Sequence, residues 1–354
     1  MDKNVKSIHS KVMKIPFFTA VLAAAALLAS CAKDAGTDPA PAPAGPDAIR
    51  ATAKSLTIEA DAAPGSKAAY TGEDAANLKA AVYGSKTAGD YTSTYVAGTM
   101  TFQSGTDASN AVSFDTGATG STSLPADKSS VFLTALYPAA GWGSLGTTAS
   151  ASFSGKEDIM AAAQCEVAKA GGSGDKVAFA TFNFKHLLTR IDVTIKGEDA
   201  SAVAAWGAVQ SVKLTQVKGS STFANQIAVT LADGAAATGT GAFTGSETGW
   251  SFYTATDETL KETALTETEV AYATTIMAPF TAAESSDLTL EVVTKTADGS
   301  TVTSTVNVNV PTTGGTDTQG KAYKIKLEFK KADISGVATV AGWGDPIEII
   351  QPVL

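Results

Sequence analysis

Residue types that build catalytic and metal sites are scarce in this 354-residue sequence. It contains two cysteines and two histidines, and only Cys165 and His186 lie beyond the first fifty residues. A protein metal site needs more His, Cys or clustered carboxylates than the surroundings of His186 offer. We therefore expect no metal and no cofactor.

Catalytic motifs are also missing from the sequence. No Gly-x-Ser-x-Gly elbow accompanies His186, which stands at the start of a predicted strand and is expected to be structural. Carboxylate pairs such as Glu157 with Asp158, or Glu267 with Glu269, have no feature that would place them across a cleft. The Gly-rich segment 239–245 opens no helix, so it predicts a loop and not a phosphate cradle. The sequence does not indicate an enzyme.

Positive charge is in short supply. The chain has 26 basic and 35 acidic residues, a net charge of −9, and four of the lysines fall within the first fourteen residues. No basic stripe follows, which argues against nucleic acid as a partner. An acidic, evenly charged surface favours solubility outside the cell.

The N-terminus predicts a lipoprotein signal peptide over residues 1–30. A basic segment precedes the apolar run 15–29, which is short for a membrane-spanning helix and ends in Leu-Ala-Ser before Cys31. That ending is the pattern of a bacterial lipobox, so Cys31 is the predicted lipidation site. With Cys31 modified, Cys165 has no intrachain disulfide partner and is expected to be a packed apolar residue.

Residues 31–53 are predicted to form a lipidated, semi-extended tether, because they are rich in Pro and Ala and lack apolar periodicity. The first residues of this tether, 32–34, read Ala-Lys-Asp. They resemble the short signal that directs Bacteroidales lipoproteins to the outer face of the outer membrane.

Alternation of apolar and polar residues predicts β-strands in the rest of the chain. The clearest alternation spans 323–330, and 188–195 is similar. Residues 131–137 are more continuously apolar, which predicts a central strand covered on both faces. For the hairpin 288–310, only a three-residue loop puts both apolar sets on one face, so we expect Leu290 opposite Val306 and a left-handed Gly299.

The chain length after the tether suits two domains. The Gly-rich segment 171–175 suggests the boundary, giving an N-terminal β-sandwich over 54–174 and a C-terminal one over 175–354.

Several segments together resemble the fimbrillin family, the major and minor subunits of the type V pili of Bacteroidales. They are Phe132–Pro138, Asp158–Ala162, Phe184–Val193 and a C-terminal strand ending in Trp343. The resemblance implies an all-β fold of two tandem transthyretin-like Greek-key β-sandwiches. It also implies polymerisation by donor-strand exchange, in which a protease releases a plug strand and the C-terminal segment of a neighbouring subunit replaces it.

The segments that donor-strand exchange requires can be matched to residues of this sequence. The candidate plug strand has Leu56, Ile58 and Ala60 facing a groove. Lys67 stands where the family has an arginine at the processing site, and Arg50 is the alternative. The candidate donor strand is 346–354, with these apolar side chains: Ile347, Ile349, Ile350 and Val353.

The sequence is compatible with two functions. The first is a pilus subunit that partners other pilins, a surface protease and, through its lipid, the outer membrane. The second is a non-polymerising surface lipoprotein, either a pilus anchor or accessory protein or a module that binds a host glycan or protein. The four tryptophans could form a sugar-binding face, although tryptophans in β-sandwiches mostly pack in the core or at the rim.

Overall fold

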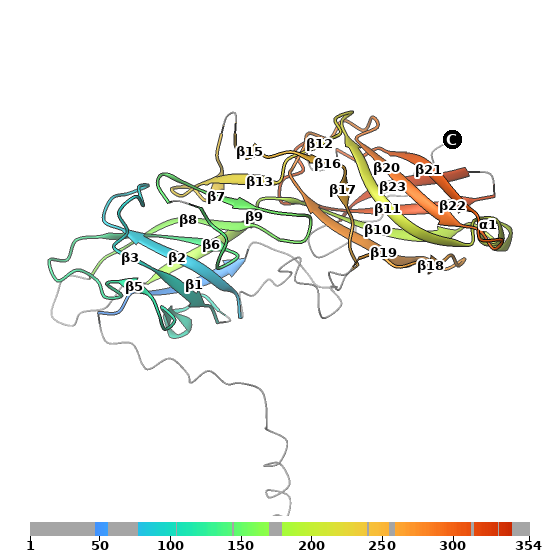
Figure 1. The fold of residues 1–354 in the computed structure, drawn as a ribbon. Helices are drawn as coiled ribbons and strands as arrows, with labels where there is room; N and C mark the ends of the chain where they lie inside the picture. The colour runs from blue at the N-terminus through green and yellow to red at the C-terminus, as the bar shows by residue number, and fades with distance from the viewer. Residues whose placement is uncertain are drawn as a thin grey trace, which may run out of the picture. The chain divides into compact units, whose positions relative to one another are not determined.

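The computed structural model describes residues 47–55, 77–103, 105–143, 145–169, 179–238, 241–254, 259–312, 315–331 and 333–341 (Figure 1). The predicted all-β fold class is confirmed. In these ranges helix is confined to α1 (Ala200–Trp206) and a 3-10 turn at Ala108–Asn110. None of the described helices is long and apolar enough to cross a membrane.

The first half of the described chain forms one eight-stranded sheet in the order β4-β1-β9-β8-β6-β2-β3-β5. The bounds of its strands are β1 Arg50–Ser55, β2 Lys79–Ser85, β3 Val96–Thr101, β4 Val112–Ser113, β5 Thr119–Gly120, β6 Val131–Tyr137, β8 Met160–Val167 and β9 Ala180–His186.

This sheet curls around a core of its own. Strands β3 and β9 are separated by three others, which in a flat sheet would place them about 19 Å apart. Yet the ring of Phe102, just after β3, lies 6.1 Å from Phe182 and 6.0 Å from Phe184, both on β9. The inward residues of most of these strands, β1 included, belong to the same buried cluster. Strand β6 is central and has buried residues on both faces, as predicted: Leu133 belongs to this cluster and Leu136 to the second one.

The second half is a sandwich of two sheets. One has the order β19-β10-β22-β23 and the other β17-β11-β20-β21, with β18 paired to β11. The bounds are β10 Thr189–Gly197, β11 Ala208–Val217, β17 Trp250–Ser251, β18 Thr263–Ala264, β19 Val270–Met277, β20 Leu288–Lys295, β21 Thr301–Val308, β22 Ala322–Lys330 and β23 Asp333–Ala341.

Apolar alternation accounts for this sandwich. Along β22 the alternate residues from Tyr323 to Phe329 are fully buried, and Ile191, Val193 and Ile195 of β10 are buried beside them. The hairpin β20–β21 has the predicted register, with Leu290 opposite Val306. Thr296 and Ser300 close a three-residue loop in which Gly299 has φ +86.

Small strands complete the fold. Strand β13 (Gln226–Thr230) pairs with β14 (Ala235–Ala236), β15 (Phe243–Thr244) and, from the first half, β7 (Thr148–Ser152). Strands β12 (Thr222–Phe223) and β16 (Glu247–Thr248) form a separate pair. The pairing of β7 with β13 joins segments almost eighty residues apart, which no local pattern indicates.

Two boundaries differ from the sequence-based expectation. Residues 50–53 were assigned to the tether but belong to strand β1. Strand β9 was assigned to the C-terminal domain but pairs with β8 and β1, so the first sheet extends to His186. The Gly-rich segment 171–175 therefore connects two neighbouring strands of one sheet.

Candidate strand-exchange site

Strand β1 occupies a place near one edge of the first sheet. It runs parallel to β9 over five residue pairs, from Ala51 opposite Ala180 to Ser55 opposite Phe184. On its other side, among the described strands, it pairs with the two-residue strand β4. If β1 left, the edge of β9 would expose unpaired backbone groups, which is a template for another strand.

The inward face of β1 is made of small residues. Ala51 and Ala53 are buried and belong to the cluster that contains Phe102, Phe182 and Phe184. Because burial stabilises by about 0.8 kcal/mol per CH₂ group, alanines contribute less here than larger aliphatic side chains would. The strand is thus held mainly by its backbone ladder and by polar contacts.

Those polar contacts gather at the start of the strand. The guanidinium of Arg50 donates to the carbonyls of Ala108 and Ala111, each at 2.8 Å from Nη2. Thr52 Oγ1 lies 3.2 Å from the Thr181 hydroxyl. Arg50 is the first residue of β1 and precedes the predicted plug residues, which lie outside the described ranges. Cleavage after Arg50 would require β1 to leave the sheet first.

The last described strand, β23, also lies at the edge of its sheet. Strand β23 closes its sheet and ends with Ala341 opposite Ala322 of β22. Thirteen residues follow it in the sequence and include the candidate donor strand. These predicted site residues lie outside the described ranges: Cys31, Leu56, Ile58, Ala60, Lys67, Ile347, Ile349, Ile350 and Val353.

His186 is buried, as expected, but it is the last residue of β9 and does not start a strand. Its Nδ1 lies 2.9 Å from Oδ2 of Asp158, and the two side chains are 5% and 0% exposed. Sequence reasoning missed this partner, because 28 residues separate the two and no motif links them. At this exposure the imidazole and the carboxylate are closed to a substrate, so the geometry is that of a structural pair.

The described tryptophans are each held by a hydrogen bond from the indole N–H to a backbone carbonyl. Trp142 donates to Pro138, Trp206 to Lys330 and Trp250 to Ile276. The ring of Trp250 also stacks on Phe223 at 6.0 Å. These contacts fit packing residues better than a shared sugar-binding face. Trp343 lies outside the described ranges.

Cys165 packs against the first core, and its Sγ lies 3.2 Å from the carbonyl of Thr181. Burial raises the pKa of this thiol, which disfavours the reactive thiolate form. No group of three or more His, Cys, Asp or Glu side chains suited to a metal occurs in the described part of the chain.

A solved structure shares this fold, and others are similar to it to a lesser degree. A candidate cell adhesion protein from Bacteroides uniformis is 19% identical with a TM-score of 0.51, covering 84% of this chain and 97% of that one. Another from Bacteroides ovatus is 16% identical with a TM-score of 0.47, covering 87% and 100%. A fimbrial protein from Bacteroides vulgatus is 14% identical with a TM-score of 0.43, covering 83% and 99%.

Among functionally curated proteins, none matches this sequence. The profile of the fimbrillin-like family matches residues 66–343, which is well over half of the chain. The chain therefore belongs to the fimbrillin-like family.

Proposed function

We propose that this protein is a structural pilus subunit that polymerises on the cell surface by protease-triggered donor-strand exchange at β1, and thereby supports adhesion. Membership of the fimbrillin-like family supports a pilus or adhesin role at the cell surface, without enzymatic activity. The observation that carries the finer proposal is β1 itself: a short strand with an alanine face, which covers the edge of β9.

The replacement strand is the segment 346–354 of a neighbouring subunit. It adds to the edge of β9 by main-chain hydrogen bonds, the mode called β-augmentation. Its isoleucines, Ile347 and Ile349 on one face and Ile350 on the other, offer more apolar area than Ala51 and Ala53 of β1. While β1 is covalently attached, its high effective concentration outweighs that difference.

Processing removes this advantage. We assign the cut to Lys67, beyond β1, so that the released segment includes residues 47–55 and the plug residues Leu56, Ile58 and Ala60. The region matched by the family, residues 66–343, leaves out both β1 and the donor segment, the two parts that exchange. The partners are thus other pilin subunits and a surface protease.

Before assembly the precursor is proposed to be an outer-membrane lipoprotein anchored through Cys31. Replacing Cys31 with Ala should leave an unlipidated form that no longer partitions with outer membranes. If the variant partitions as the unchanged protein does, the anchor is not at Cys31.

Deletion of residues 346–354 tests the exchange. The deleted protein should still be processed but should remain monomeric on an unheated detergent gel, where the unchanged protein gives a ladder that boiling removes. Glu348→Gln is the matched control, because it keeps the apolar residues, and it should polymerise. A ladder from the deleted protein would rule out exchange through this segment.

The alternative is a non-polymerising surface lipoprotein, either a pilus anchor or accessory protein or a module for a host glycan. A glycan module would expose aromatic side chains, and the buried contacts of Trp250 and the bonded indoles of Trp142 and Trp206 give it little support. An anchor would keep β1 and the C-terminal segment in place.

A further inference from the structure

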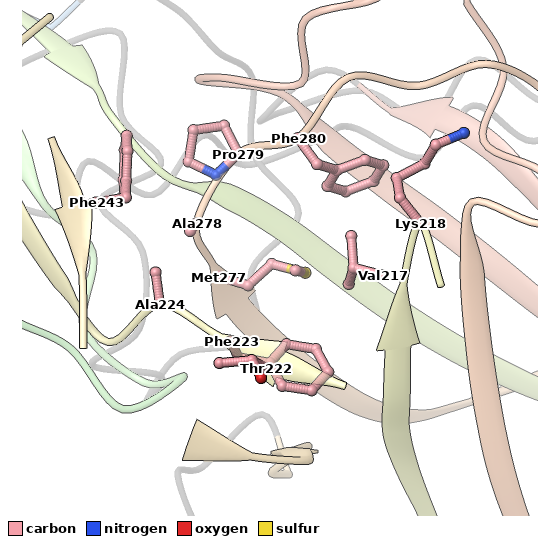
Figure 2. A pocket seen from close by; sticks show the side chains of 10 residues that line it. All are labelled: Val217, Lys218, Thr222, Phe223, Ala224, Phe243, Met277, Ala278, Pro279 and Phe280. Carbon is pink, nitrogen blue, oxygen red and sulfur yellow. The ribbon is translucent and has the colours of Figure 1, made fainter. Parts of the chain in front are cut away.

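A pocket of about 270 Å³ lies at one end of the C-terminal sandwich (Figure 2). Its walls are largely apolar and come from the end of β11, from β12 and β15, and from the end of β19 with the residues after it. The apolar lining comprises Val217, Phe223, Phe243, Met277, Pro279 and Phe280.

The polar groups of the lining are poorly placed to orient a sugar. Lys218 Nζ lies 3.0 Å from Asp287, and Figure 2 shows its side chain turning away from the middle of the pocket. Among the lining residues this leaves the hydroxyl of Thr222 as the polar side-chain group beside the apolar walls. Polar ligands need several convergent polar groups, and drug-sized ligands occupy pockets of about 300–1,000 Å³. Size and chemistry favour one or two aliphatic side chains.

The sheet register places the end of the described chain near this pocket. Met277 of β19 is opposite Thr189 of β10, the neighbouring Arg190 is opposite Ala322 of β22, and Ala322 is opposite Ala341 of β23. Met277 and Ala341 are therefore at the same end of one sheet, three strand spacings or about 14 Å apart.

The chain after Ala341 is long enough to reach the pocket. Ile347 is six residues further along, which an extended chain spans with about 20 Å. The segment 346–354 carries Ile347, Ile349, Ile350 and Val353, together with Leu354. Exposed aliphatic side chains of this kind gain free energy when they are buried against an apolar surface.

We propose that in the free subunit this pocket holds aliphatic side chains of residues 346–354 of the same chain. The inference rests on the proposed function in that the docked segment is the one later donated. Docking within one chain has an effective concentration in the millimolar range, so weak contacts suffice. Weak contacts also let the segment leave for the groove of a neighbour.

Methyl NMR of the unpolymerised chain tests the proposal. With Met and Ile methyl groups labelled, the methyl of Met277 should show cross-relaxation to a tail isoleucine, Ile347, Ile349 or Ile350. Filling the pocket by Ala224→Phe should abolish these cross-peaks. Ala297→Phe, an equal change at the exposed tip of the β20–β21 loop, should retain them.

A second variant covers the case in which Ala224→Phe does not fold. Deleting residues 346–354 leaves the described chain intact and should shift the Met277 methyl resonance. Absence of cross-peaks in the unchanged protein, or an unmoved Met277 resonance after deletion, overturns the proposal. Cross-peaks between a Met-labelled, tail-deleted copy and an Ile-labelled full chain would overturn the assignment to the same chain.

The outcome separates docking from polymerisation. Ala224→Phe leaves β1 and β9 unchanged, so it should still give the detergent-resistant ladder. A ladder without cross-peaks rejects docking and leaves strand exchange standing. Cross-peaks without a ladder from the unchanged protein reject strand exchange and leave docking standing.

Discussion

Strands β1 and β22 both run parallel to a neighbour, but they are held very differently. Strand β22 pairs with β10 over eight residues and with β23 over nine, and its inward residues include Leu327 and Phe329, both fully buried. Strand β1 has five pairs with β9 and two with β4, and its inward residues are alanines. The strand proposed to exchange therefore has less apolar burial to lose than β22.

The largest effect is expected where the sandwich is best packed. Leu327→Ala should lower the free energy of unfolding by about 2–5 kcal/mol, because it leaves a cavity between two sheets. Ala53→Gly on β1 should cost about 1 kcal/mol. Denaturant unfolding of the monomer measures the loss of unfolding free energy in both variants. Equal losses in the two variants would contradict the proposed difference in packing between β22 and β1.

The next effect concerns the buried Asp158–His186 pair at the end of β9. His186→Gln should lower stability by about 1–3 kcal/mol, since the buried contact between His186 and Asp158 is lost. Catalysis offers a separate check: the purified protein should show no hydrolase activity. Any such activity that disappears in His186→Gln would show that His186 is not merely structural.

The pH dependence of stability should come from the C-terminal sandwich and not from β1. Burial opposes ionisation of Asp287, but the backbone N–H of Val310 at 2.9 Å, the Lys218 ammonium and the N–H of Ala283 outweigh it and lower its pKa. A lowered pKa means that this stabilisation is present above the unfolded value of about 3.9 and is lost as pH falls below it.

Thermal unfolding between pH 6 and pH 3 measures this loss. The unchanged protein should become less stable toward pH 3, and Asp287→Asn should flatten that part of the profile. A profile as steep in the variant as in the unchanged protein would show that other carboxylates dominate.

The smallest effect is expected at the start of β1. Arg50→Ala removes the donor to Ala108 and Ala111 at the surface, which should cost about 0.5–1.5 kcal/mol. Hydrogen exchange of residues 50–55 should accelerate, while that of β22 should not change. Equal acceleration in both strands would mean that β1 does not open by itself.

Apolar alternation was enough to predict the strongest strands from the sequence. Residues 323–330 and the register of the β20–β21 hairpin follow from period-two patterns with large side chains. Strand β1 alternates too, but alanine is a weak strand former, and the Pro- and Ala-rich residues before it suggested that the tether continued.

Other features depended on partners far along the chain. The β7–β13 pairing and the Asp158–His186 contact have no local signature. Helix α1 did have a local sequence signature, which the sequence analysis did not use. Asp199 caps the N-terminus of the helix by accepting a hydrogen bond from the Ala202 N–H, and Gly207 ends the helix with φ 68. At the candidate strand-exchange site, the sequence suggested donor-strand exchange, whereas the position of β1 required the structure.

The most direct test of the central claim is the N-terminal sequence and mass of subunits recovered from the detergent-resistant ladder. Strand exchange at β1 predicts subunits that begin after Lys67 and have lost residues 50–55. Ladder subunits that retain Arg50–Ser55 would contradict it.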